Sequence, residues 1–169
     1  MNTSRRTVLW TLAAVTGGAL AIARLPARAA KRSGRFEIEK TPAEWREILT
    51  PEQYRVLREH GTERAGSSPL DNEKRAGVYR CAGCQLPVFS STTKYDSGTG
   101  WPSFYAPLKG AIGTSIESGF FGDNTEVHCR RCGGHLGHVF DDGPKPTGLR
   151  YCMNGVALTF VPAAQRTPA

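Results

Sequence analysis

The body of the chain lacks a basic run. The 169 residues carry 22 basic and 15 acidic side chains, a formal net charge of +7. Four of the arginines lie within residues 1–29, and without them 18 basic residues stand against 15 acidic ones. A mild surplus without clustering is typical of a solvated surface, whereas a nucleic-acid-binding protein gathers its basic residues on one face. The composition therefore predicts no nucleic-acid partner.

Long helical periods and internal repeats are also absent after Gly77. The length suits one domain with a core of its own, and a second domain is not needed. Short strand-like runs follow one another, separated by glycine and proline. They lie at Val78–Arg80, Val88–Phe89, Ala111–Glu117, Thr125–His128 and Val156–Val161. We expect a mainly β fold with antiparallel sheets, preceded by short helices.

Two helix starts stand ahead of this β region. Thr41–Glu44 and Thr50–Gln53 each combine a capping threonine, a proline at the first helical position and an acid or amide three residues after the threonine. Gly61 would end the second helix, and Thr62–Asn72 would follow as a surface loop. The apolar stripes that would face the core are Trp45, Ile48 and Leu49 in the first helix and Tyr54, Val56 and Leu57 in the second.

Residues 1–29 have the pattern of an export signal. Ser4-Arg5-Arg6 precedes an apolar run, Val8–Ala23, and small residues lead to Ala29, after which we expect cleavage. The paired arginines indicate the twin-arginine route, so the predicted location is the periplasm. The alternative is an uncleaved anchor in the inner membrane. The predicted organisation is a signal at 1–29 and a single domain at 30–169, with its core at about 36–161.

The chain has five cysteines, and one of them has no obvious partner. Cys81/Cys84 and Cys129/Cys132 form two Cys-x-x-Cys pairs, which together predict a tetrahedral zinc site. Two disulfides are the alternative in an exported protein, and a nucleic-acid-binding zinc ribbon is another. We favour structural zinc because short Cys-x-x-Cys loops are natural chelates. A transport route for folded proteins would let the thiolates bind zinc before they meet an oxidising compartment.

Cys152 is then free for chemistry. A free thiol is either an inert buried group or a nucleophile, depending on whether its surroundings favour the thiolate. Arg150, two residues earlier, would lie on the same side of a strand. His135 and His138 are candidate proton donors in a Gly-rich extended stretch, and their spacing lets only one face the site directly. A structural role for His135 remains an equal alternative.

Several longer motifs carry a family resemblance. SGTGWPSF at Ser97–Phe104, HLGHVFDDGPKPTG at His135–Gly148 and RYCMN at Arg150–Asn154, together with the two Cys-x-x-Cys pairs, resemble a methionine-R-sulfoxide reductase of the B type. The resemblance implies two antiparallel sheets with a four-cysteine zinc clip. Thr99 stands where many members of this family carry a resolving cysteine.

The resemblance also implies roles for individual residues. Cys152 would attack the sulfoxide and become a sulfenic acid, and His138 would hold or protonate the oxygen. His135 and Asn154 would support His138. Trp101 would pack against the S-methyl group, and Phe104 and Arg150 would also contact the substrate.

These roles imply particular partners. The enzyme would repair oxidised proteins after oxidative stress, with free methionine-R-sulfoxide as an alternative substrate. It would act as a monomer, with an external small thiol or thioredoxin-like protein as reductant. Two other interpretations remain open: a zinc-ribbon scaffold, in which Cys152 is buried and unreactive, and a peroxidase-like thiol enzyme, which has no use for the Trp101 wall.

Overall fold

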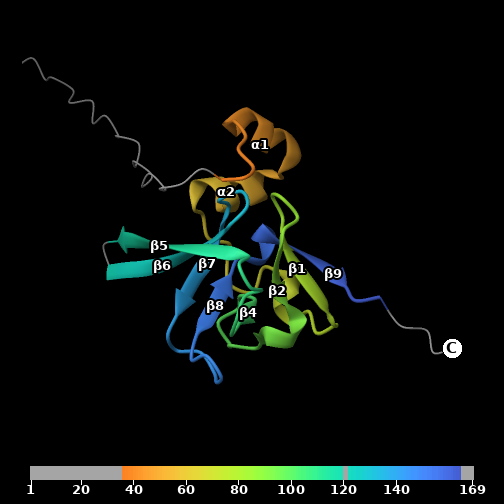
Figure 1. The fold of residues 1–169 in the computed structure, drawn as a ribbon, viewed down its shortest axis with the longest axis vertical. Coiled ribbons are helices and arrows are strands. Elements are labelled where there is room, and N and C mark those ends of the chain that lie inside the picture. The colour runs from red at the N-terminus through yellow and green to blue at the C-terminus, as the bar shows by residue number, and fades with distance from the viewer. Residues whose placement is uncertain (1–35, 120–121, 165–169) are drawn as a thin grey trace, which may run out of the picture.

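The computed structural model describes residues 36–119 and 122–164. The expected export signal lies outside the described residues. Within them, two short helices lie at one end of two antiparallel sheets (Figure 1). The prediction of a mainly β fold with short N-terminal helices is confirmed.

The two helices begin where the threonine caps predict. Helix α1 spans Pro42–Ile48 and helix α2 spans Pro51–Glu59. In both, the threonine oxygen accepts a hydrogen bond from the third helical N–H, and the Glu or Gln side chain accepts one from the threonine N–H. These reciprocal bonds satisfy backbone donors that a helix start leaves open, which explains how such short helices are stable at these positions.

All strand pairs are antiparallel. The smaller sheet has the order β2-β1-β9, with β1 at Gly77–Cys81, β2 at Pro87–Ser90 and β9 at Leu158–Pro162. The larger sheet has the order β3-β4-β8-β7-β6-β5. Its strands are β3 Lys94–Tyr95, β4 Ser103–Phe104, β5 Ile112–Gly119, β6 Gly122–Cys129, β7 His135–Phe140 and β8 Arg150–Met153. Single turns of 3-10 helix lie at Pro69–Asn72, Ser91–Thr93 and Gly155–Ala157.

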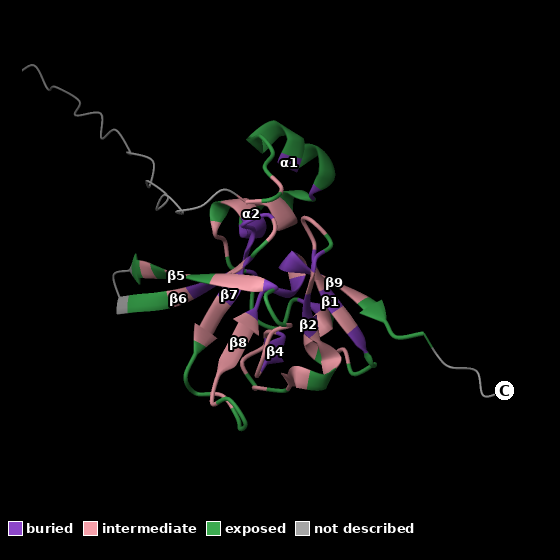
Figure 2. Ribbon diagram, viewed as in Figure 1, coloured by how far each residue is buried: buried purple, intermediate pink, exposed green. Residues whose placement is uncertain are grey.

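Aromatic rings from both sheets build the centre of the core. The ring of Phe104 stacks on Phe89 at 4.4 Å between centroids and meets Tyr79 edge-on at 4.9 Å. All three side chains are fully buried. The buried face of α2 adds Val56 and Leu57, so the helices close one end of the core (Figure 2).

The structure corrects three predictions about the helices and the last strand. Ile48 is 54% exposed rather than part of the buried stripe, because α1 is so short that Trp45 and Leu49 already cover its inner side. The left-handed residue that ends α2 is His60, with φ of 57°, and not Gly61. The expected strand at Val156–Val161 begins only at Leu158, after a turn of 3-10 helix.

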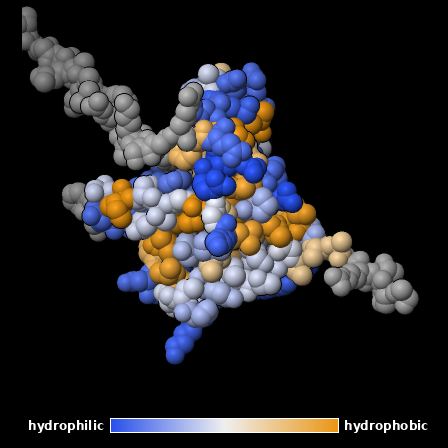
Figure 3. All heavy atoms as spheres, in the orientation of Figure 1, coloured by the Kyte–Doolittle hydropathy of each residue, from blue (hydrophilic) through white to orange (hydrophobic). Residues whose placement is uncertain are grey.

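On the face shown in Figure 3, hydrophobic atoms form small separate groups among polar and charged ones. No helix among the described residues is long and apolar enough to cross a membrane.

Candidate active site and cysteine cluster

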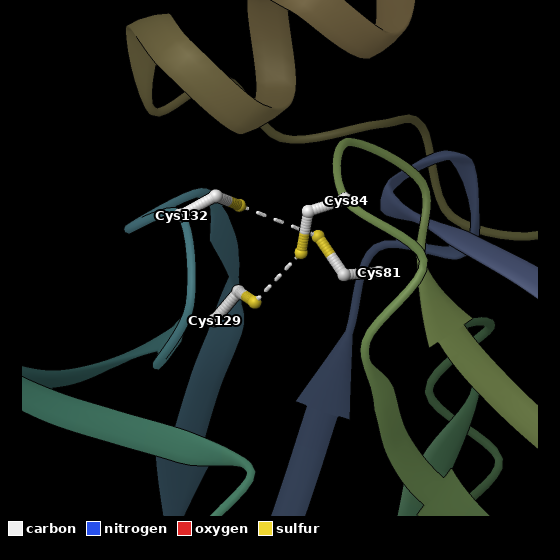
Figure 4. Close-up of side chains that lie close together, drawn as sticks. All are labelled: Cys81, Cys84, Cys129 and Cys132. Atoms are coloured by element: carbon white, nitrogen blue, oxygen red, sulfur yellow. Dashed lines mark hydrogen bonds between the residues drawn. The ribbon is translucent and has the colours of Figure 1, made fainter. Parts of the chain in front are cut away.

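The four cysteines of the two Cys-x-x-Cys pairs meet at one point between the sheets (Figure 4). The sulfurs of Cys81 and Cys132 lie 3.7 Å apart, and those of Cys84 and Cys129 lie 3.5 Å apart. Four sulfurs about 2.3 Å from a zinc ion stand roughly 3.8 Å from one another in a tetrahedron. The residues present therefore fit a zinc ion, and all four are free of disulfide bonds.

The two cysteine turns have the same backbone geometry. In each, the first cysteine's carbonyl accepts from the N–H four residues later, and its own N–H donates to the carbonyl five residues later. The residue directly after the second cysteine is left-handed in both turns, with φ of 60° at Gln85 and 65° at Gly133. The first turn joins β1 to β2 and the second joins β6 to β7, so an ion held there would cross-link the two sheets and supply no redox chemistry.

A nucleic-acid role for this cluster gains no support from its surroundings. Arg130 donates to the carbonyl of Gly110, and Arg131 lies 3.5 Å from a carboxylate oxygen of Glu37. Since both arginines beside the cluster already have partners, they do not form the free basic face that phosphate binding needs.

Cys152 lines a pocket of about 340 Å³ on the larger sheet. It lies on β8, directly opposite His138 on β7, and residues paired in this way point to the same face of the sheet. The other lining residues are Thr62, Thr99, Trp101, Gly137, Phe140, Arg150 and Asn154. The pocket therefore presents a thiol and an imidazole to the same space.

A chain of hydroxyl groups leads to the Cys152 thiol. Thr99 Oγ1 lies 3.9 Å from its sulfur and 2.8 Å from Ser97 Oγ, which lies 2.7 Å from the buried Ser103 hydroxyl. Burial raises the pKa of Cys152, while the contact with Thr99 and the charge of Arg150 oppose that rise. The expected influence of Arg150 on the thiol is therefore present but is outweighed by burial.

Arg150 is held in place by a bidentate ion pair. Its Nε and Nη2 each donate to Asp142 at 2.8 Å, and its guanidinium lies 4.4 Å from the centre of the Phe140 ring. The hydrogen bonds from Arg150 lower the pKa of the Asp142 carboxyl group. This geometry fixes a positive charge at the pocket wall without covering the thiol.

The two histidines of the HLGH motif occupy different environments. His138 lines the pocket, and its Nε2 lies 3.1 Å from Glu117 on β5. His135 is 1% exposed and lies outside the pocket, with its Nδ1 3.0 Å from Glu126 on β6. Burial lowers the pKa of His135 despite this carboxylate. Only one of the pair faces the pocket, as their spacing predicts.

Asn154 and Trp101 are both tied to the backbone of Glu63. The Asn154 oxygen accepts from the Glu63 N–H at 2.9 Å, and Trp101 Nε1 donates to the Glu63 carbonyl at 3.2 Å. The buried Glu63 carboxylate in turn accepts from the N–H groups of Gly155 and Val156. Burial raises the pKa of Glu63, and the two backbone donors limit that rise.

Phe104 is not among the residues that line the pocket. It is fully buried in the aromatic core, so its position supports packing rather than the predicted contact with substrate.

Gly137 carries a constraint that the sequence did not reveal. Its φ is 155°, and a Cβ there would collide with the carbonyl oxygen of Cys152. Glycine therefore lets β7 approach β8, the strand that carries Cys152.

Comparison with known proteins finds one family that covers most of the chain. The SelR domain family matches residues 49–162. Proteins named peptide methionine sulfoxide reductase MsrB are similar: that of Agrobacterium fabrum is 54% identical over 127 residues, 75% of this chain and 94% of the relative. That of Leptospira interrogans is 52% identical over 126 residues, 74% of this chain and 96% of the relative.

One solved structure gives a much weaker match. The Mis18 "Yippee-like" domain aligns with 54% of this chain and all of its own length, at 16% identity and a TM-score of 0.45, too low to bear on function. The SelR match covers well over half of the chain, and the curated relatives are aligned over nearly their whole length. The chain belongs to the SelR domain family, together with the MsrB peptide methionine sulfoxide reductases.

Proposed function

We propose that this chain reduces the R epimer of methionine sulfoxide in oxidised proteins, with Cys152 as the nucleophile. The chain is an oxidoreductase of the peptide methionine sulfoxide reductase class. Its relatives are named for the reduction of methionine sulfoxide. The proposed role of Cys152 rests on one observation: Cys152 on β8 pairs with His138 on β7, and both residues line the same pocket. A scaffold role gives no reason for a cysteine to line a pocket.

The first step joins the cysteine sulfur to the sulfoxide sulfur. The Cys152 thiolate attacks, and His138 donates a proton to the sulfoxide oxygen as negative charge grows there. The oxygen then passes to the cysteine sulfur and methionine leaves, so the sulfoxide is reduced and Cys152 is oxidised by two electrons to a sulfenic acid. Trp101 would contact the S-methyl group on the side away from the oxygen, which selects one epimer.

The second step regenerates the thiol with an external reductant. One thiol displaces the sulfenic hydroxyl as water and forms a mixed disulfide, and a second thiol releases Cys152 by exchange. Thr99 lies beside Cys152 and supplies no sulfur, and the other four cysteines belong to the cluster. We therefore propose a small thiol or a thioredoxin-like protein as reductant, with no internal disulfide.

The test compares the two epimers with one reductant. Purified protein with dithiothreitol should reduce the R epimer and leave the S epimer, and Cys152→Ser should abolish turnover without loss of fold or metal. Turnover in Cys152→Ser would refute the mechanism, and turnover of a peroxide in place of either sulfoxide would favour a peroxidase. Equal rates on both epimers would refute the stereochemical role of Trp101.

We also propose that residues 1–29 export the folded, zinc-loaded domain to the periplasm. The proposal rests on the paired arginines ahead of an apolar run and on the coupling of zinc binding to folding. N-terminal sequencing of the protein from a periplasmic extract should begin at residue 30. Recovery of the whole chain in the membrane fraction would support the uncleaved anchor instead. The domain boundary at residue 30 and the monomeric state stay predictions.

A further inference from the structure

A second group of metal-ligating side chains lies next to His138, which lines the pocket. One ligand atom from each of His60, Glu117, Glu126 and His135 lies within 4.8 Å of the other three. His60 Nδ1 is 2.6 Å from Glu117 Oε1 and 3.5 Å from Glu126 Oε1, and His135 Nδ1 is 3.0 Å from the same Glu126 oxygen. Two imidazole nitrogens and two carboxylate oxygens therefore converge on one point.

The outer oxygens of both carboxylates are held by other groups. Glu117 Oε2 contacts His138 at 3.1 Å. Glu126 Oε2 accepts from the Ser115 hydroxyl at 2.5 Å and lies 3.5 Å from His128 Nδ1. Each glutamate thus turns one oxygen toward the converging nitrogens while its second oxygen is fixed from outside, which is how partners around a metal centre orient ligating carboxylates.

The distances suit a small divalent cation. Nitrogen and oxygen ligands bind zinc at about 2.0–2.1 Å, which places tetrahedral ligands roughly 3.3–3.4 Å apart. The three separations, 2.6, 3.0 and 3.5 Å, bracket that value. Glu126 and His135 are each 1% exposed and are fixed on neighbouring strands, while the side chains of His60 and Glu117 are about one-third exposed. The group has a rigid inner half and an outer half that an ion can reach from solvent.

The net charge of the four side chains also favours a divalent cation. With both imidazoles neutral, the four groups carry two negative charges, which a divalent ion balances. Both imidazoles turn the same ring nitrogen, Nδ1, toward the carboxylate oxygens, and a neutral imidazole nitrogen is a common metal ligand. Hard carboxylates with imidazoles also differ from the all-thiolate cluster, so the two sites would prefer different ions.

We propose that His60, Glu117, Glu126 and His135 form a second divalent-cation site, separate from the cysteine cluster, and that occupancy of this site slows the reductase. The regulatory part rests on the proposed function. Glu117 bridges the site and His138, so an ion on its inner oxygen withdraws negative charge from the carboxylate and weakens its contact with the imidazole. His138 is then held less firmly in the orientation that delivers a proton, and reduction of the sulfoxide is slower.

The binding test uses the full chain loaded with one zinc ion per molecule. Cobalt(II) chloride is added, and bound cobalt is measured by equilibrium dialysis and by its visible spectrum. We expect one cobalt per chain with weak bands and without the intense sulfur-to-cobalt absorption of a thiolate site. His60→Asn keeps a residue that tolerates the left-handed cap, and Glu117→Gln keeps the size of the side chain. Each should weaken cobalt binding at least about tenfold.

Asp123→Asn is the matched control, because it removes one carboxylate from the same hairpin at an exposed position outside the cluster. It should bind cobalt like the wild type. The proposed site is refuted if the zinc-loaded wild type takes up no cobalt, if the spectrum is that of a thiolate site, or if both variants bind as tightly as the control. These results do not depend on whether the chain reduces sulfoxides.

The regulatory test measures single-turnover sulfoxide reduction with and without saturating cobalt. The rate should fall several-fold in the wild type and in Asp123→Asn, and stay constant in His60→Asn. A wild-type rate that cobalt leaves unchanged would overturn the regulation while the binding data stand. Absence of reduction in the cobalt-free wild type would overturn the proposed function instead.

Discussion

Thr99 stands close enough to Cys152 for a cysteine at position 99 to form a disulfide with it. Its hydroxyl oxygen is 3.9 Å from the Cys152 sulfur, and a disulfide needs about 2.05 Å. A movement of roughly 2 Å must close that gap. Thr99 lies in a loop between Gly98 and Gly100, both with positive φ, so the loop has the backbone freedom that small movements need. We expect Thr99→Cys to form a disulfide with Cys152 after one turnover without reductant.

The expected gain in stability follows from the size of the closed loop. The two positions are 53 residues apart, and closing such a loop removes about 4 kcal/mol of unfolded-chain entropy at 25 °C. Strain from moving the loop reduces that figure. At about 2–4 °C per kcal/mol for a chain of this size, the oxidised variant should melt on the order of 10 °C above its reduced form.

Mass spectrometry and calorimetry after one turnover test both expectations. The wild type should carry a sulfenic acid that a dimedone probe captures, and Thr99→Cys should carry an internal disulfide with no captured adduct. Thr99→Ser controls for loss of the threonine, and Lys109→Cys adds a thiol at an exposed site elsewhere. An internal disulfide in the wild type would show that a cluster cysteine acts as resolver and would refute the reasoning, as would a Thr99→Cys protein that still accumulates the sulfenic acid.

Substitutions at the cysteine cluster and in the pocket should also change stability and reactivity. Cys129→Ser should release the metal and lower the melting temperature sharply, because binding energy at a structural site is folding energy; metal analysis and calorimetry check this, and an unchanged melting temperature would contradict it. His138→Ala should slow single-turnover reduction by about 10²–10⁴-fold with a smaller effect on substrate affinity, and a normal rate would remove it from proton delivery. Because burial raises the pKa of Cys152, the rate of its alkylation by iodoacetamide should increase with pH, with a midpoint above the ordinary thiol pKa of 9.0. Arg150→Gln should move the midpoint of this pH profile higher, because the Arg150 charge opposes the rise in pKa. Gln85→Gly should stabilise the fold by about 1 kcal/mol, since a non-glycine residue in the left-handed conformation costs about that much, and denaturant titration measures it.

The sequence predicted best those features that depend on neighbours in the chain. Both capping boxes involve contacts three residues apart, and both helices begin where the threonines place them. The end of α2 was predicted less well, since His60 takes the left-handed cap ahead of Gly61. The side chain of His60 contacts Glu117 on a distant strand, and such a contact leaves no local pattern in the sequence.

The same distinction separates the site residues that the sequence reveals from those it hides. Cys152 stood out because the other four cysteines formed two regular pairs. Glu117 and Glu126 had no such signal, because only the pairing of β5, β6 and β7 brings them beside the HLGH histidines. Glu63 was expected in a surface loop, yet it is 4% exposed and anchors both Trp101 and Asn154.

The cysteine cluster and the pocket are connected through a single strand. Cys132 ends the cysteine turn three residues before His135, and β7 then carries His138 to the pocket. Leu136, between the two histidines, accepts hydrogen bonds from both the backbone and the side chain of Asn154, which ties β7 to the segment that follows Cys152. An ion held at the turn would therefore restrain the first residues of β7, which these hydrogen bonds connect to the segment after β8. For this reason the cluster can matter to catalysis although none of its sulfurs lines the pocket.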